Sequence, residues 1–94
     1  MKSFTDDDEG YLRWTRDDPD GFVVKVERGE RPGYAVLHRS SCSSISRERD
    51  DGAYTERGYK KVGSNDLSEL RVYAKSIGRA DGSFSKQCGH CKPV

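Results

Sequence analysis

Two stretches in the first half of the chain have the residue pattern of β-strands. Residues 21–28 (GFVVKVER) are β-branched and aromatic and lie between turn-forming residues, which is typical of a strand. Residues 34–38 (YAVLH) follow a connection at 29–33 that contains Gly and Pro, as tight turns do. We therefore expect a β-hairpin whose second strand ends at His38.

The clearest helix is predicted for residues 66–77, where apolar residues recur at helical spacing. These apolar positions are Leu67, Leu70, Tyr73, Ala74 and Ile77. Asp66 with Glu69 three residues later resembles a capping box, which marks the start of a helix. Gly78 stands where a glycine commonly ends one.

Two weaker patterns add a second helix and a third strand. Residues 6–17 begin with acidic side chains, which suit the positive end of a helix dipole. The apolar side of that helix would consist of Tyr11, Leu12 and Trp14. Residues 54–62 (YTERGYKKV) favour a strand, in which Gly58 marks a bulge or a close backbone approach.

The remaining segments are expected to lack regular structure. Residues 1–5 form a loose N-terminal end, 40–53 a polar loop with one helical turn at 42–46, and 79–87 a second polar loop. The fold class that follows is α+β, with a small antiparallel sheet and one main helix.

The composition indicates one small domain, residues 1–94, that needs a cross-link. Apolar residues make up 32% of the 94 residues and charged residues 35%, and so short a chain buries only about 60–65% of its unfolded surface. A metal or a disulfide commonly stabilises domains of this kind. The chain has three cysteines, and an odd number argues against a secreted disulfide framework.

The hydropathy and charge of the chain limit its expected location and partners. The chain has no apolar stretch of signal-peptide or membrane-span length, so we expect a cytoplasmic protein without a membrane partner. The formal net charge is +1, which gives no overall basic excess. The first twenty residues are acidic, so any basic patch lies beyond them.

Two short motifs together predict a metal site. Cys88-x-x-Cys91 has the spacing of a zinc knuckle, and His38-x-x-x-Cys42 leaves the predicted hairpin toward a polar loop. The four residues make a Cys₃His set, which is a common closed site for Zn²⁺. The ion would tie the hairpin to the C-terminal segment and close the α+β domain.

Three alternatives to this site stay open. The Cys88–Cys91 pair has the spacing of a thioredoxin-like redox motif, although such a pair normally begins a helix. His90 lies inside the knuckle and competes with His38 as the fourth ligand. Taken singly, His38 would be an ordinary strand-end histidine and Cys42 a buried thiol.

Three segments, LHRSSC (37–42), SELRVYAKSIGR (68–79) and CGHCKP (88–93), resemble the metal-binding module of the Ada DNA-alkylation-repair proteins. Residues 11–28 also resemble an uncharacterised, mostly actinobacterial domain family. The resemblance implies zinc at His38, Cys42, Cys88 and Cys91 in a DNA-repair or restriction setting. Ada-type modules hold four cysteines, whereas this chain has a histidine first. We therefore do not expect methyl transfer, for which Cys42 would be the first residue to test.

The favoured function is a nucleic-acid-binding module with DNA as partner. Basic residues and tyrosines alternate around the loop and the third strand, and they suit phosphates and bases respectively. The candidates are Arg39, Arg47, Arg49, Tyr54, Arg57, Tyr59, Lys60 and Lys61. Acidic residues are mixed among them, so a simple solvated loop is the competing interpretation.

Two further functions are weighed against DNA binding. The acidic first twenty residues, with Tyr11, Leu12 and Trp14, could dock on a larger protein partner of a phage or bacterium; the simpler interpretation is a surface helix that packs Trp14 into the core. An enzyme is not expected. A closed zinc site leaves no position for water, and no small-molecule substrate is indicated. A nuclease or a methyl acceptor would be the enzymatic alternative.

Overall fold

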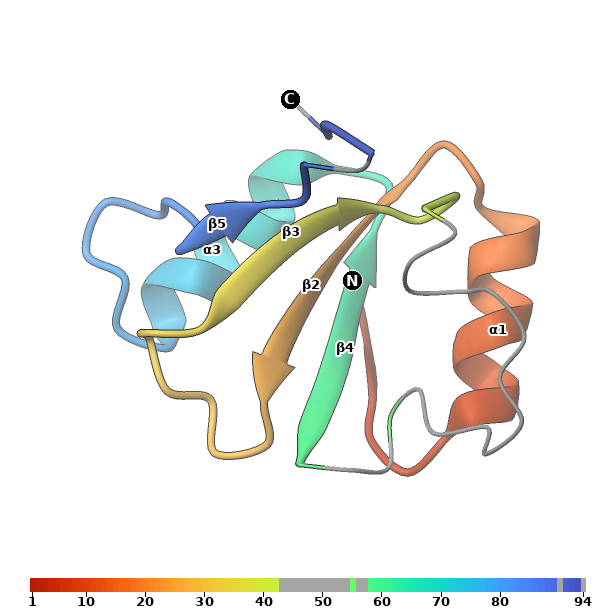
Figure 1. Ribbon diagram of the computed structural model, residues 1–94, viewed down its shortest axis with the longest axis horizontal. Helices are drawn as coiled ribbons and strands as arrows, with labels where there is room; N and C mark the ends of the chain where they lie inside the picture. The colour runs from red at the N-terminus through yellow and green to blue at the C-terminus, as the bar shows by residue number, and fades with distance from the viewer. Residues whose placement is uncertain (43–54, 56–57, 90, 94) are drawn as a thin grey trace.

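The computed structural model describes residues 1–42, 55, 58–89 and 91–93, and Figure 1 shows the arrangement of the elements. In chain order they are β1 (Lys2–Phe4), α1 (Asp8–Asp17), β2 (Phe22–Glu27), β3 (Ala35–Arg39), β4 (Tyr59–Ser64), α3 (Leu67–Ser76) and β5 (Lys86–Gln87). The strands form one mixed sheet in the order β1-β4-β2-β3-β5. The predicted α+β class is therefore confirmed.

The centre of the sheet is the hairpin that the sequence predicts. β2 and β3 pair antiparallel, with Val24 opposite Leu37. On its other side β2 pairs antiparallel with β4, with Val24 opposite Val62. The third strand runs from Tyr59 to Ser64, whereas the sequence predicts residues 54–62. Directly before it, Gly58 has a positive φ of 67°, a conformation that glycine adopts without strain.

The predicted loose N-terminal end is wrong, because residues 2–4 form β1. β1 pairs antiparallel with β4, which places Phe4 opposite Lys61. Phe4 is buried, and its ring packs edge-on against Tyr11 of α1 with centroids 5.7 Å apart. Burial of this one aromatic side chain, which is worth about 1.5–3 kcal/mol, favours pairing of the short strand.

The predicted polar loop at 79–87 also contains a strand, and it changes the sheet from antiparallel to mixed. β5 pairs parallel with β3, with Val36 opposite Lys86. Ser85 begins this contact: its backbone N–H donates to the Ala35 carbonyl over 2.9 Å, and its hydroxyl oxygen accepts the Ala35 N–H over 2.8 Å. Both β5 residues are polar and exposed, so their sequence carries no strand signal.

The helices begin and end close to where the sequence places them. Asp66 caps α3 by accepting the Ser68 N–H over 2.9 Å. Glu69 does not complete a standard capping box; its carboxylate accepts the Ser64 hydroxyl, whose oxygen accepts the Asp66 N–H. Gly78 ends the helix with a φ of 111°. Within the described residues, neither helix is long and apolar enough to cross a membrane.

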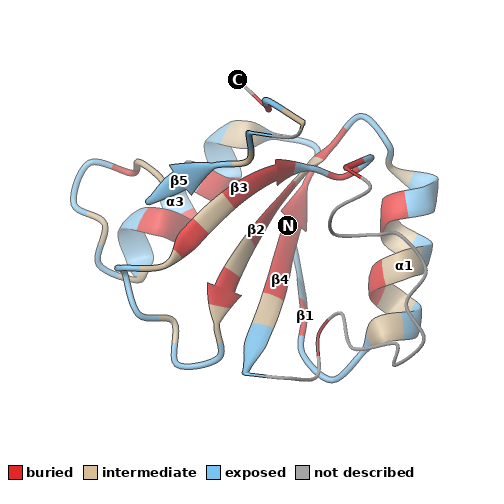
Figure 2. Ribbon diagram, viewed as in Figure 1, coloured by how far each residue is buried: buried red, intermediate tan, exposed pale blue. Residues whose placement is uncertain are grey.

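The two helices cover opposite faces of the sheet. Successive strand residues point to opposite sides, so neighbouring residues of β2 contact different helices. Val24 and Val26 pack with Leu70 and Tyr73 of α3 in the larger core. Val23, which precedes Val24 and points to the other face, packs with Phe4, Tyr11 and Cys42 on the α1 side. Figure 2 shows these buried positions along β2, β3 and β4.

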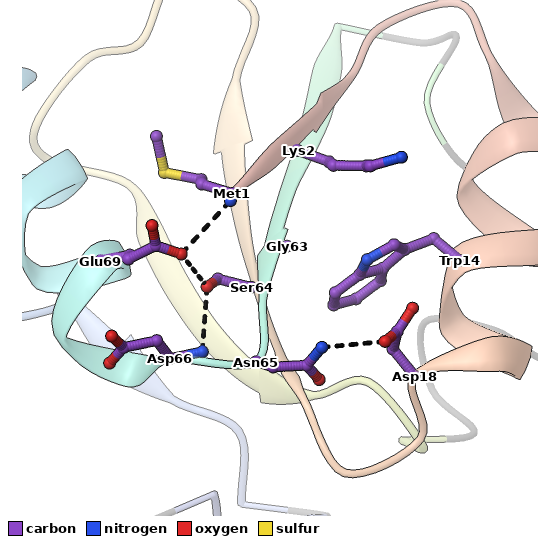
Figure 3. A pocket seen from close by; sticks show the side chains of 9 residues that line it. All are labelled: Met1, Lys2, Trp14, Asp18, Gly63, Ser64, Asn65, Asp66 and Glu69. Atoms are coloured by element: carbon purple, nitrogen blue, oxygen red, sulfur yellow. Dashed lines mark hydrogen bonds and ion pairs between the residues drawn. The ribbon is translucent and has the colours of Figure 1, made fainter.

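Trp14 of α1 packs on the sheet and lines a surface pocket of about 470 Å³. Figure 3 shows its ring next to Gly63, with Asp18 and Asn65 below it. The Asn65 amide donates to the Asp18 carboxylate over 2.8 Å. The other residues of the pocket are Met1, Lys2, Ser64, Asp66 and Glu69. Trp14 is thus partly buried, whereas Tyr11 of the same helix is fully buried.

Substitution of Gly63 by alanine is expected to destabilise the fold by about 1–3 kcal/mol through overpacking. A Cβ at this position would lie 2.7–3.0 Å from three ring carbons of Trp14, so the ring would have to move. Gly29→Ala is the matched control, because no heavy atom lies within 4 Å of a Cβ there. Urea unfolding in the presence of zinc measures both, and equal midpoints for the two variants would contradict this packing.

Candidate metal centre

The four residues predicted to bind a metal lie together. Their ligand atoms, one each from His38, Cys42, Cys88 and Cys91, are all within 4.8 Å of one another. The Cys42 and Cys88 sulfurs are 3.9 Å apart. In a tetrahedral site with Zn–S bonds of about 2.3 Å, two sulfurs lie about 3.8 Å apart. The cluster therefore has close to the dimensions that a zinc ion requires.

The sheet brings the two halves of this cluster together. His38 is near the end of β3, on the α1 side, and Cys42 follows in a turn in which its N–H donates to the Arg39 carbonyl over 3.0 Å. Cys88 directly follows β5, and its N–H donates to the Leu37 carbonyl over 2.9 Å. The parallel pairing of β5 with β3 thus places the knuckle beside His38.

Arg39 holds the second cysteine of the knuckle. Its backbone N–H donates to the Cys91 sulfur over 3.2 Å. Its guanidinium donates to the carbonyls of Cys91 and Lys92 over 3.1 and 3.2 Å. Backbone N–H groups directed at a cysteine sulfur support the thiolate form that binds metals. The sequence analysis assigned Arg39 to nucleic acid and missed this role, which depends on a residue 52 positions away.

His38 has a buried ring nitrogen that lacks a hydrogen-bond partner. The side chain is 7% exposed, and among the described residues Nδ1 has no partner. Burial, followed by the positive charges of Lys25 and Lys61, lowers the pKa of His38 to about 4. The imidazole is therefore neutral at pH 7 and has a lone pair to share. A buried polar atom without a partner is unfavourable, and coordination to a metal would satisfy it.

Two lysines lie on the same face of the sheet as the candidate site, and their positive charges act on His38. Lys25 and Lys61 lie opposite each other on β2 and β4, on the same side of the sheet as His38. Lys61 is only 4% exposed, and its ammonium lies 5.2 Å from the centre of the Tyr11 ring. Three thiolates, a neutral histidine and Zn²⁺ carry a net negative charge, which nearby cations stabilise.

The cysteines are present as free thiols. Burial raises the pKa of the Cys91 thiol to about 11, so it is protonated at neutral pH until a metal displaces the proton. The Cys88–Cys91 pair follows a strand rather than opening a helix, unlike a thioredoxin-like redox pair. The geometry thus favours metal binding. His90, the competing ligand, lies outside the described residues.

Such a donor set fits zinc in a closed site. Thiolate and imidazole ligands in tetrahedral arrangement are typical of Zn²⁺. With four protein ligands no coordination position is left for water or a substrate, which is the pattern of structural rather than catalytic zinc. The arrangement can therefore cross-link β3 to the C-terminal segment.

Four of the eight predicted nucleic-acid residues, Arg39, Tyr59, Lys60 and Lys61, lie in the described part of the chain. Arg47, Arg49, Tyr54 and Arg57 lie outside the described residues. The Lys60 ammonium pairs with the Glu30 carboxylate over 2.7 Å, and Lys61 is buried beneath Tyr11. Arg39 is exposed but is bonded to the knuckle. Among the described candidates this leaves Tyr59, whose side chain is 38% exposed.

Comparison of the chain with protein-family models, curated proteins and solved structures found no match. The resemblance to Ada-type modules therefore stays a prediction from residues 37–42, 68–79 and 88–93. The metal assignment rests on the geometry of the four side chains.

Substitution of a ligand is expected to abolish zinc binding, because one metal–ligand bond is lost and the domain that depends on the ion unfolds. Native mass spectrometry should find one zinc ion per wild-type chain and none in Cys42→Ser, Cys88→Ser or His38→Ala. His90→Ala is the matched control for His38→Ala and should retain the ion. The reverse result for the two histidine variants would make His90 the fourth ligand.

Proposed function

We propose that this chain is a zinc-stabilised domain whose Cys₃His centre is structural, and that the domain binds nucleic acid. The observation that carries the first part is the convergence of four ligand atoms, from β3 and from the C-terminal segment, within 4.8 Å. The need for reduced thiols fits a cytoplasmic location.

The structural role follows from how short the strand pairing of the C-terminal segment is. β5 has two residues, both exposed. Cys88 and Cys91 pack against the smaller core around Tyr11 and Val23, so the metal would complete that core. Metal binding in small zinc domains contributes on the order of 10 kcal/mol in gross terms, which exceeds what two strand residues supply.

Nucleic-acid binding is supported by the resemblance to a DNA-repair module and by the exposed Tyr59. Lys25 adds a cation, with its ammonium 4.4 Å from the centre of the Tyr59 ring. Arg39, Lys60 and Lys61 contribute less than their sequence suggests, because each already contacts other groups of the protein. The proposed setting is DNA repair or restriction.

Docking on a protein partner through the acidic first twenty residues is the alternative function. It has less support, because Tyr11 is fully buried and Trp14 packs against Gly63. Neither ring is fully available for a partner, although Trp14 borders the pocket in Figure 3. Leu12, the third residue of that set, is also partly buried.

Removal of the metal is expected to unfold much of the domain. A strong zinc chelator should abolish the cooperative thermal transition followed by circular dichroism, and added zinc should restore it. The control is the same chelator saturated with zinc beforehand. A transition that survives complete metal removal, verified by mass spectrometry, would contradict the structural role.

Zinc-loaded protein is expected to bind DNA at micromolar concentration in low salt, the range of modest electrostatic and stacking contacts. Fluorescence anisotropy with a labelled oligonucleotide, as single strand and as duplex, measures this affinity. Absence of binding to both forms would overturn the nucleic-acid function and favour the protein-docking alternative. It would leave the zinc assignment unchanged.

A further inference from the structure

Two tyrosines lie together on the α1 side of the sheet, at the end of β2 remote from the metal centre. Tyr59 is the first residue of β4 and lies opposite Glu27 of β2. Tyr34 immediately precedes β3, on the other side of β2. Their ring centres are 5.4 Å apart and the planes meet at 46°. The two rings therefore meet across β2.

Lys25 reaches both rings. Its ammonium is 4.4 Å from the centre of the Tyr59 ring and 5.9 Å from that of Tyr34. Lys25 is two residues before Glu27, so both side chains point to the face where the tyrosines lie. A cation is thus held beside an aromatic pair, which restricts the orientation of the rings.

Tyr59 is the exposed member of the pair, whereas Tyr34 is half-buried. Large apolar or aromatic side chains are exposed at few described positions, and Tyr59 is one of them, with Met1 and Val72 as the others. Met1 and Val72 carry no aromatic ring, whereas Tyr59 has a second ring and a cation beside its own. Of these exposed positions, only that of Tyr59 combines flat aromatic surface with positive charge.

An aromatic ring with an adjacent cation matches the chemistry of an unpaired nucleotide. A base stacks on the ring whatever its sequence, and the cation attracts the phosphate. Bases in a duplex are already stacked on each other and do not present their faces to such a ring. The pair therefore suits single-stranded nucleic acid rather than duplex.

We propose that Tyr59, supported by Tyr34 and Lys25, forms a stacking site for an unpaired base of single-stranded nucleic acid. This inference rests on the nucleic-acid function proposed above. It adds that the ligand is single-stranded and that it binds on the α1 side of the sheet. Tyr34 and Lys25 were not among the candidates from the sequence.

Stacking rather than charge carries most of this binding. Glu27 lies in the same row as the tyrosines and offsets the charge of Lys25. Lys60 points away from this face and pairs with Glu30. We therefore expect contact with about one or two phosphates. For single strands this corresponds to a slope of about −0.7 to −1.4 in a plot of log affinity against log salt.

The test uses the full zinc-loaded chain and an oligo-dT of about 12 nucleotides, within the usual site size of single-strand binders. Anisotropy of the labelled strand gives the affinity, with a duplex of the same length for comparison. A second strand carries 2-aminopurine, whose fluorescence is quenched when an aromatic ring stacks on it. The variants are Tyr59→Ala, Tyr59→Phe and the control Val72→Ala. Val72 is an exposed residue of α3, the helix on the opposite face of the sheet.

Wild-type protein should bind the single strand more tightly than the duplex and quench 2-aminopurine. Tyr59→Ala should weaken binding by about tenfold or more, the value of one lost base stack, and should remove the quenching. Tyr59→Phe retains the ring and should stay within about twofold of wild type, as should Val72→Ala. Zinc content and thermal unfolding establish that each variant is folded.

Unchanged affinity of folded Tyr59→Ala, or a preference of the wild type for duplex, would overturn the stacking site while the nucleic-acid function stands. Absence of wild-type binding to either form would overturn both proposals. These outcomes separate the failure of the site from the failure of the function.

Discussion

The pairing of β5 with β3 is the contact on which the candidate metal centre depends. It places Gln87 opposite Leu37 and lets the Cys88 N–H donate to the Leu37 carbonyl, next to His38. His38 of β3 and Cys42 of the following turn then lie next to Cys88 and Cys91, which directly follow β5. Because β5 is only two residues long, the strand pairing and the metal reinforce each other. The pairing sets the geometry, and the ion would supply most of the free energy.

The surroundings of the site are as specific as its ligands. Arg39 uses its backbone and its side chain to hold the knuckle, and Lys25 and Lys61 bring positive charge to the same face. A site so arranged tolerates three thiolates in a partly buried position, where an isolated negative charge would be unfavourable. Arg39 and Lys61, which suggest a surface for phosphates when the sequence is read alone, therefore make contacts within the protein.

The ligands and the main elements could be predicted because their signals are local. Each ligand pair spans at most five residues, and the hairpin and α3 repeat apolar residues at a fixed period. β1 and β5 could not be predicted, because Phe4 is buried only where Tyr11 covers it and Lys86 pairs only where β3 offers an edge. The roles of Arg39 and Lys61 depend in the same way on residues distant in sequence.

The position of the C-terminal segment along β3 has a consequence for self-association. It satisfies backbone groups of Ala35 and Leu37 that would otherwise form an open strand edge. Open edges of apolar strands recruit other chains and lead to aggregation. Loss of the ion would release this cover and leave β3 free to pair with a neighbouring molecule. Occupancy of the metal centre would thus govern self-association of the chain as well as its folding.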